Sequence, residues 1–365
     1  MDPLTHTLVG ANLGSTRLAG TTRLSAAACI IGANLPDLDA VLYFTGHDDL
    51  ALGFRRGWTH GILALVVLPL ALTGLLLAYD RLRPDPARKV SAGWLLALSS
   101  IAILTHPSLD WLNNYGMRWL MPFDGRWSYG DSVFIMDPLL WIVLGVGWLA
   151  GRRASWRVVG LWGVFTLAVA WVVGGRSPGY LALVAAIALV LLAALLWSPG
   201  GERERTRRAF ARGALVVAAV YIAGRLATNE AAEHVVRDEL LARGVAPIEK
   251  LMASPHPIDP RRWDLVAQTS ESYRYGVYEW PGGGLELASE TIPRPRPSPE
   301  WDAARRHPSV RGFMTWVRFP WYEVERTPEE TRVWIYDARY ARRRTGRGFG
   351  GELVVLPNEG SRTGE

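Results

Sequence analysis

Residues 60–78 read HGILALVVLPLALTGLLLA, and this stretch decides the class of the fold. After His60 it carries no charged side chain, and its length is close to the ~20 apolar residues that an α-helix needs to cross a bilayer. Residues 93–111 form a second stretch of this length, although they contain His106 and Asp110. Two such runs in succession predict a polytopic helical membrane protein.

Further apolar runs extend the predicted membrane region in both directions. Residues 3–18 and 24–34 are too short to span, so we expect them to form a half-inserted helical hairpin. Downstream, residues 213–224 form a short candidate whose helical pattern continues to about residue 242. Three longer candidates precede it, at residues 135–150, 158–173 and 180–197. We therefore predict an all-α polytopic membrane domain with a short helical hairpin and about five to six transmembrane helices.

The positions of Lys and Arg predict the orientation of these helices, because cytoplasmic loops carry an excess of positive charge. The loops that follow residues 78, 150 and 197 are basic, whereas the alternate loops hold only Arg118, Arg126 and Arg176. We therefore expect the basic loops in the cytoplasm and the His60 side outside. If residues 213–224 cross the membrane, the C-terminal region is outside as well.

Composition changes sharply after residue 228, where the chain becomes rich in Arg, Glu and Pro. Several short stretches there alternate between apolar and polar residues as β-strands do. They are residues 263–269, 273–280, 315–319, 332–336 and 352–356. Glycines at 282–284 mark a loop, and residues 293–299 form a Pro-rich connection. This pattern predicts a small soluble α+β domain over residues 229–365.

The formal net charge of +6 does not indicate a nucleic-acid partner, because many of the arginines lie in loops where a membrane protein places them anyway. Cys29 is the single cysteine, so an internal disulfide is excluded, and its apolar surroundings predict a small buried side chain. Asp2 and His6 stand where a cleavable signal peptide has a basic region. We therefore expect internal apolar segments to direct membrane insertion.

Four short islands place His or Asp at the edges of the apolar runs. They are LTHT at 4–7, NLPDLD at 34–39, RGWTH at 56–60 and HPSLD at 106–110. His106 and Asp110 are four residues apart, so a helix places both on one face. Ionisable groups within a span are costly and usually face the protein interior or a water-filled cavity. The pair indicates metal or catalytic use, and a structural pair that ties helices together is the alternative.

The other islands add further potential ligands. A local break between Asp37 and Asp39 could aim both carboxylates at one cation, and the alternative is a polar turn in which Asp37 caps a helix. Carboxylates combined with imidazoles favour Zn, Mn or Fe. Either His6 or His60 alone would be an ordinary hydrogen-bonded core histidine. Grouped with His106 on one predicted side of the membrane, they indicate a shared metal site.

These islands resemble the YdjM family of bacterial inner-membrane proteins, which are often described as membrane-bound metal-dependent hydrolases. The matching stretches cover roughly residues 1–142. They are MDPLTHTLVGANLG, GANLPDLD, RRGWTHG, THPSLDWLNNYGMRWLMPF and GDSVFIMDPLL. The pieces PHPIDPRRWDLVAQT, FMTWVRFP and VWIYDARY are similar to a C-terminal extension that some members carry. The combination of these stretches is specific to the family, although no single stretch is.

The resemblance implies metal-dependent hydrolysis in the bacterial inner membrane. It marks six metal ligands, namely His6, Asp37, Asp39, His60, His106 and Asp110. Its last motif contains Asp131 and Asp137, which could complete a ligand shell or act as a catalytic base. Members often have His where this chain has Arg55. This difference could change the number of bound metal ions or the charge preference for the substrate. A looser similarity to zinc-dependent phospholipase C enzymes, which gather His and Asp around several zincs, favours phosphoester substrates.

The expected cofactor is a divalent metal, zinc or else manganese, as one or two ions. Two nearby metals can activate a water and clamp a phosphoryl oxygen. Arg118 and Arg126 lie in the same predicted outer loop and could bind a substrate phosphate. Contact with lipid headgroups or solvent is the alternative for both arginines. The expected partners are membrane lipid and a lipid or phosphoester substrate, with no nucleic acid.

Three regions result from these observations. Residues 1–142 form the His/Asp metal-site domain, residues 143–228 the transmembrane anchor, and residues 229–365 the soluble domain, which we expect in the periplasm. The predicted ligands lie within the first 140 residues, and we find no matching halves of the kind that transporters show. We predict a metal-dependent hydrolase at the outer face of the membrane. The alternatives are a non-enzymatic scaffold or regulator and a transporter, in which the same residues form a structural site or a proton relay.

Overall fold

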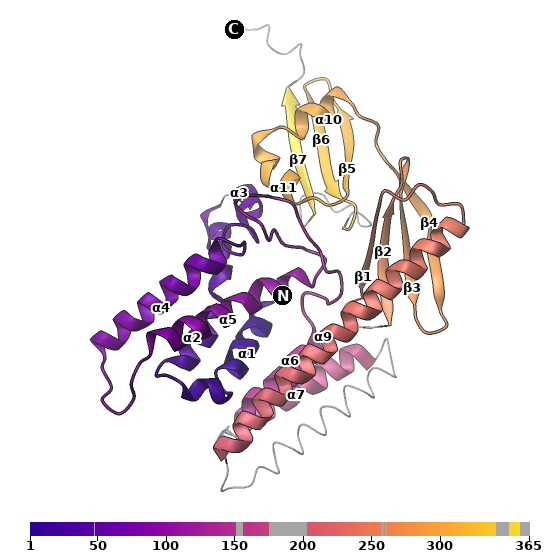
Figure 1. The fold of residues 1–365 in the computed structure, drawn as a ribbon. Coiled ribbons are helices and arrows are strands. Elements are labelled where there is room, and N and C mark those ends of the chain that lie inside the picture. Colours follow the sequence, from indigo (N-terminus) through magenta and orange to yellow (C-terminus); the bar gives the residue numbers. More distant parts are fainter. Residues whose placement is uncertain are drawn as a thin grey trace, which may run out of the picture. The chain divides into compact units, whose positions relative to one another are not determined.

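The computed structural model describes residues 1–46, 48–150, 156–174, 203–256, 259, 261–340 and 350–357 (Figure 1). The chain divides into two compact units. The helical unit comprises Met1–Leu38, Arg56–Ala231 and Ser254–Arg262, and the sheet unit comprises Asp39–Arg55, Ala232–Ala253 and Trp263–Glu365. A short segment from the N-terminal region, residues 39–55, thus belongs to the same unit as the C-terminal strands.

The helical unit is built from helices, two of which have a first turn that is capped by an aspartate. Its elements are α1 (Pro3–Leu13), η1 (Arg17–Gly20), α2 (Ser25–Gly32), α4 (Ala64–Leu82), α5 (Ala92–Trp111), α6 (Pro138–Leu149), α7 (Trp156–Gly174) and most of α9 (Arg203–Ala242). Asp2 accepts a hydrogen bond from the Thr5 amide at 3.0 Å, and Asp137 accepts one from the Leu139 amide at 2.9 Å. A proline at the first helical position follows each cap, which fixes where α1 and α6 begin.

Within the described residues, three helices are long and apolar enough to cross a membrane. They are α4, α5 and the part of α9 from Glu204 to Ala242. A fourth span exists if α2 and η2 (Leu35–Thr45), which meet at 46°, are counted as one bent element. The predicted count of five to six is therefore not confirmed. Residues 180–197 lie outside the described part of the chain, and α6, at 12 residues, is short for a span.

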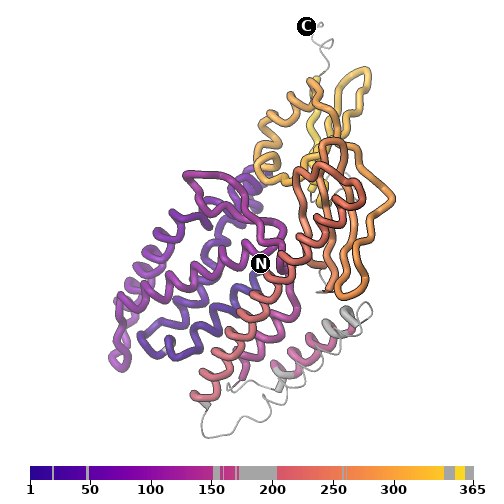
Figure 2. The backbone as a smooth tube through the Cα atoms, turned by 45° about the vertical axis from the view of Figure 1, so that its right-hand side comes forward, coloured from indigo at the N-terminus to yellow at the C-terminus, as the bar shows by residue number. Residues whose placement is uncertain are grey.

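Close packing of small residues joins the helices around α2. A Cβ atom on Gly10 of α1 would lie 2.5 Å from the Cys29 carbonyl oxygen, and one on Gly32 would lie 3.0 Å from Cβ of Ala102 in α5. Small residues at such positions let helix backbones approach closely. Cys29 is buried in this interface, as its apolar surroundings predict. Helices α4 and α5 pack side by side as an antiparallel pair (Figures 1 and 2).

The sheet unit holds two sheets. The first has the strand order β1-β2-β3-β4 and the second has the order β5-β6-β7. The strands are β1 (Lys250–Pro255), β2 (Arg262–Gln268), β3 (Ser272–Glu279), β4 (Gly284–Pro293), β5 (Pro320–Arg326), β6 (Glu330–Asp337) and β7 (Gly351–Pro357), and the short helices are α10 (Pro299–Ala304), η3 (Pro308–Val310) and α11 (Arg311–Trp316). Pairing of β3 with β4, and of β6 with both β5 and β7, is antiparallel.

Four of the five predicted strands are confirmed, and the prediction for residues 315–319 is wrong. Thr315 and Trp316 end α11, and the next strand begins at Pro320. Phe313 and Trp316 are both buried, and their spacing of three residues fits one face of a helical turn. Burial of this pair on one helical face therefore favours a helix up to Trp316, although the alternation of the residues that follow suggests a strand.

The segment from the N-terminal region packs into the sheet unit through two glycines. Helix α3 (Asp48–Phe54) packs on α11, and the Asp49 carboxylate accepts hydrogen bonds from the Gly312 and Phe313 amides at 2.8 and 3.0 Å. A Cβ atom on Gly312 would lie 1.8 Å from the Asp49 carbonyl oxygen, and one on Gly53 would lie 2.9 Å from the Gly312 Cα. Only glycine at position 312 permits this approach of the two helices.

Gly312→Ala is expected to separate α3 from α11, because the added methyl group meets backbone that cannot move away as a flexible side chain would. The cost should be about 1–3 kcal/mol and should appear as faster proteolysis within residues 39–55. The matched control is Gly74→Ala in α4, where a Cβ atom meets nothing within 4 Å. Equal proteolysis of both variants would contradict the packing described for α3.

Candidate metal centre

Five of the predicted site residues lie together in the helical unit. His6 comes from α1, Asp37 from the start of η2, His60 from the turn before α4, and His106 and Asp110 from successive turns of α5. The three histidines are fully buried and Asp110 is 1% exposed, whereas the Asp37 side chain is 16% exposed. Asp37 therefore marks the side of the cluster that is accessible to solvent.

Four of these residues form a group with the spacing of a metal site. The His60 Nε2 atom lies 3.4 Å from Asp110 Oδ2 and 3.9 Å from Asp37 Oδ1. The His106 Nε2 atom lies 3.6 Å from each of the same two oxygens. One ligand atom from each of the four residues lies within 4.8 Å of the others. Among the residues that the structure describes, no other group of three or more His, Cys, Asp or Glu has this spacing.

Neighbouring groups orient both imidazoles toward the carboxylates. The Nδ1 atom of His106 lies 2.7 Å from the Ala33 carbonyl oxygen, so Nδ1 donates and the Nε2 lone pair faces the cluster. On His60, Nδ1 lies 2.9 Å from Thr59 Oγ1. Metal-binding histidines characteristically use the other ring nitrogen in this way, which fixes the tautomer and the ring orientation.

The geometry fits a divalent cation. Zinc binds nitrogen and oxygen at about 2.0–2.2 Å, so adjacent ligands of a tetrahedral ion lie about 3.3–3.6 Å apart. The separations of 3.4–3.9 Å between the imidazole nitrogens and carboxylate oxygens are close to this range. In addition, His106 Nε2 is buried without a hydrogen-bond partner among the described residues, which is costly unless a ligand satisfies it. Two nitrogen and two oxygen donors suit zinc or manganese.

Arg56 holds Asp110 in place. Its Nε lies 3.0 Å from Asp110 Oδ2, and its Nη2 donates to Asp110 Oδ1 at 3.1 Å, which makes a two-point ion pair. Its Nη1 donates to Asn113 Oδ1 at 2.9 Å, and the guanidinium lies 4.5 Å from the centre of the Tyr115 ring. The Arg56 side chain is 3% exposed, so this pair is screened little by solvent.

His6 contacts the group from one side. Its ring stacks on His106 with centroids 3.7 Å apart, and its Nε2 lies 3.3 Å from Asp110 Oδ1. Burial lowers the pKa of His6 to about 3, so the imidazole is neutral at pH 7. The N-terminal ammonium of Met1 also forms an ion pair with Asp110. Asp110 is thus the residue on which most contacts of the cluster converge.

The remaining predicted residues have other surroundings. Asp39 belongs to the sheet unit, where its carboxylate lies 3.6 Å from the Arg55 guanidinium. Asp137 caps α6 and accepts a hydrogen bond from the Tyr221 hydroxyl at 2.7 Å, and burial raises its pKa. Asp131 is buried with a φ of 44°. The structure therefore gives Asp137 a capping contact, and a catalytic role for Asp131 or Asp137 stays a prediction.

The two arginines predicted to bind substrate differ in exposure. The Arg118 side chain is buried, its guanidinium lies 5.0 Å from the centre of the Trp127 indole, and a Cβ atom on Gly57 would collide with it. Arg126 is 86% exposed and pairs with Asp124 at 2.6 Å. Of the two, only Arg126 has the exposure that contact with a headgroup in solvent requires.

Sequence reasoning missed Arg56 as part of the site. The sequence does place Arg56 in the island RGWTH, four residues before His60. In most proteins, however, a charged residue beside a turn has a solvent-exposed side chain, so this position did not indicate a site residue. The residue has a φ of 50°, and its side chain contacts Asp110 of α5. No periodicity of the sequence encodes this left-handed conformation, so the ion pair with Asp110 was not predictable.

Comparison with known proteins supports the relationship that the sequence islands indicate. The family model described as "YdjM inner membrane protein" matches residues 1–179, the stretch that contains all five clustered residues. The curated "Uncharacterized protein YfhP" of Bacillus subtilis (strain 168) is 27% identical over 150 residues, which are 39% of this chain and 43% of that protein. The match thus spans less than half of that relative, and no solved structure gives a significant match. Through residues 1–179, the chain belongs to the YdjM family of inner membrane proteins.

Proposed function

We propose that this chain is a membrane-bound metal-dependent hydrolase that cleaves a lipid or lipid-linked phosphoester. The observation that carries the proposal is the convergence of Asp37, His60, His106 and Asp110. These side chains come from three separate stretches of the helical unit, and three of the four are buried. Buried ionisable groups of this kind are expensive in a membrane protein and are characteristic of functional sites.

In this proposal Asp37, His60, His106 and Asp110 hold one divalent ion, with zinc as the metal that the donor set suits best. When bound, such an ion supplies a water of lowered pKa and polarises a phosphoryl oxygen. Arg56 and His6 act through Asp110, because both contact its carboxylate and restrict its orientation. Asp37 lies on the accessible side, so we place the substrate there.

Charge balance supports an anionic substrate. The group contains two carboxylates, and Arg56 compensates one of them directly. A divalent cation bound by neutral imidazoles would therefore leave the centre with a net positive charge, to which the Met1 ammonium adds. A centre of this sign attracts a phosphoester more strongly than a neutral ester.

Asp37→Asn is expected to lower turnover at least about 100-fold while leaving the protein folded, because the amide keeps the size of the side chain and loses the ligand charge. The assay presents mixed phospholipids in detergent to metal-loaded wild type and variant and measures released phosphate or alcohol. Asp85→Asn, in the α4–α5 loop, is the matched control and should retain activity. A chelator should abolish the wild-type signal.

The buried pair between Arg56 and Asp110 favours a second candidate function, a metal-stabilised scaffold. Ion pairs that fix one arrangement of helices occur in membrane proteins without any catalytic use. If wild type is folded and metal-replete but releases no product from any phosphorylated lipid, the scaffold is the better account. The hydrolase proposal would then be withdrawn while the metal centre would stand.

We further propose that the metal centre faces the periplasm, because the loop between α4 and α5 is rich in Arg and Lys. His60 and Asp110 lie at the opposite ends of α4 and α5 from this loop. A reporter fused near residue 85 should therefore behave as cytoplasmic, and one fused near residue 120 as external. Reversed signals would move the centre to the cytoplasmic face and contradict this orientation.

A further inference from the structure

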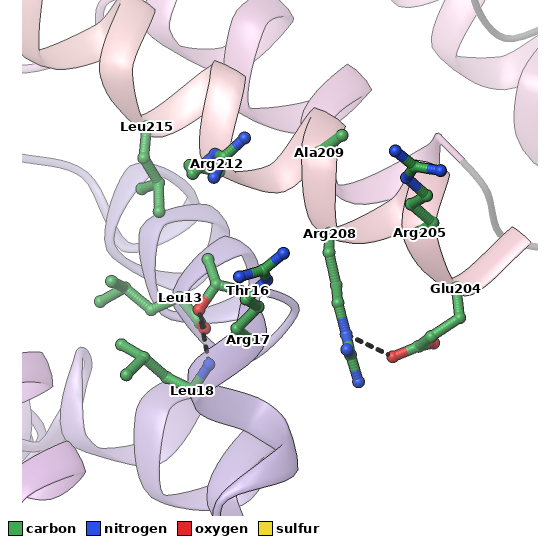
Figure 3. Close-up of a pocket in the computed structure, with 10 residues that line it drawn as sticks. All are labelled: Leu13, Thr16, Arg17, Leu18, Glu204, Arg205, Arg208, Ala209, Arg212 and Leu215. Carbon is green, nitrogen blue, oxygen red and sulfur yellow. Dashed lines mark hydrogen bonds and ion pairs between the residues drawn. The ribbon is translucent and has the colours of Figure 1, made fainter.

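A second polar site lies in the helical unit, away from the metal centre. It is a pocket of about 770 Å³ between the end of α1, the turn η1 and the first turns of α9 (Figure 3). The residues that line it are Leu13, Thr16, Arg17, Leu18, Glu204, Arg205, Arg208, Ala209, Arg212 and Leu215. We call it the arginine pocket.

The arginine pocket carries a large excess of positive charge. Four arginines line it, one from η1 and three from successive turns of α9, and Glu204 is the single acidic residue among its lining residues. Arg208 Nε donates to the Glu204 carboxylate at 2.9 Å, which is the ion pair drawn in Figure 3. Arg208 is thus compensated within the pocket, whereas Arg17 and Arg212 add positive charge from its two sides, which favours an anionic ligand.

The rest of the lining is apolar. Leu13 and Leu18 lie on the α1–η1 side, and Ala209 and Leu215 on α9 (Figure 3). Arginines followed by apolar residues along α9 are the order expected where a helix enters a bilayer, since α9 is one of the membrane-capable helices. The pocket therefore combines phosphate-binding groups with a surface that suits acyl chains.

The arginine pocket lies at the end of the helical unit that is remote from the metal centre. His6 is near the start of α1, and Leu13 and Arg17 are at and beyond its end. The turn after η1 binds the loop between α4 and α5, since the Arg23 amide donates to the Lys89 carbonyl at 3.2 Å. His106 and Asp110 occupy the far end of α5 from that loop. A ligand in the arginine pocket is therefore not the substrate of the metal centre.

We propose that the arginine pocket binds the phosphate of an anionic phospholipid, with the acyl chains along Leu13, Leu18 and Leu215. Guanidinium groups bind phosphate oxygens through paired hydrogen bonds, and basic pockets beside membrane helices on the cytoplasmic side recognise acidic headgroups. Free phosphate presents the same anionic oxygens to the arginines as the lipid headgroup does. The apolar lining of the pocket is the feature that favours the lipid over free phosphate. This inference does not depend on the proposed hydrolase activity.

The experiment measures binding of three probes to the full chain in a non-ionic detergent. The probes are dihexanoyl phosphatidylglycerol, dihexanoyl phosphatidylcholine with the same chains, and inorganic phosphate. Phosphatidylglycerol should bind at least about tenfold more tightly than either of the others, and Arg205→Gln with Arg212→Gln should weaken it about 10- to 30-fold. The matched control is Arg88→Gln with Lys89→Gln, which removes two charges from the same end of the unit and should leave binding unchanged.

Two further readouts keep the proposal testable if the double variant folds poorly. Arg205→Lys with Arg212→Lys should retain most of the affinity, and raising NaCl from about 0.05 to 0.5 M should weaken phosphatidylglycerol binding by wild type. Inorganic phosphate binding as tightly as phosphatidylglycerol would make the pocket a free-anion site. Equal loss in the control variant, or equal affinity for the two lipids, would show a diffuse surface charge and overturn the proposal.

Discussion

His106→Ala is expected to leave the purified protein without stoichiometric divalent metal. His106 Nε2 lies 3.6 Å from both Asp37 Oδ1 and Asp110 Oδ2, so it is one of four donors around a single position. With three donors left, one of them the partly exposed Asp37, the site should lose affinity by a factor of about 100 or more. Elemental analysis after gel filtration, with wild type in parallel, measures the loss directly.

The matched control for this variant is His234→Ala, because His234 lies exposed on α9 and belongs to no ligand group among the described residues. This control should keep the wild-type metal content. Full retention of metal by a folded His106→Ala variant would show that the ion binds elsewhere. Loss of metal in both variants would point to adventitious binding by histidines in general.

Arg56→Met is expected to destabilise the fold more than any single change outside the four ligand residues. The substitution removes the two-point ion pair and leaves the Asp110 carboxylate buried beside fewer compensating charges. Breaking a buried pair by removing one partner costs about 3–5 kcal/mol. Thermal unfolding followed by tryptophan fluorescence in detergent should show a clearly lower midpoint for the variant.

Two comparisons separate this effect from a general loss of charge. Arg126→Met removes an arginine that is 86% exposed, and it should leave the midpoint nearly unchanged. Arg56→Lys keeps the charge without the bidentate geometry, so it should be intermediate. An Arg56→Met midpoint equal to that of wild type would mean that Arg56 does not support Asp110 in the membrane protein.

The parts of the site that the sequence predicted are those where local spacing fixes the geometry. His106 and Asp110 are four residues apart on a continuous helix, so their common face was determined by helical geometry alone. His60 was found because it stands at the edge of a long apolar run, and the structure places it beside Asp37 and Asp110. The first two short helices and the continuation of α9 to Ala242 were likewise readable from apolar periodicity.

The parts that the sequence did not predict depend on tertiary structure. Asp37 and Asp39 were grouped because a bend could bring both to one cation. The structure instead winds residues 35–45 as a 3₁₀-helix, in which residues two apart point in different directions, and Asp39 pairs with Arg55. Similarly, nothing in the sequence of α3 shows that it packs on α11, because Asp49 and Gly312 are 263 residues apart.

X-ray absorption at the metal edge of the detergent-purified wild-type protein tests the metal centre most directly. We expect about one divalent ion per chain, bound only by nitrogen and oxygen at about 2.0–2.2 Å, with the scattering signature of two imidazoles from His60 and His106. A sulfur ligand would contradict it, because the single cysteine, Cys29, is absent from the group. A folded and active protein that contains no metal would contradict it as well.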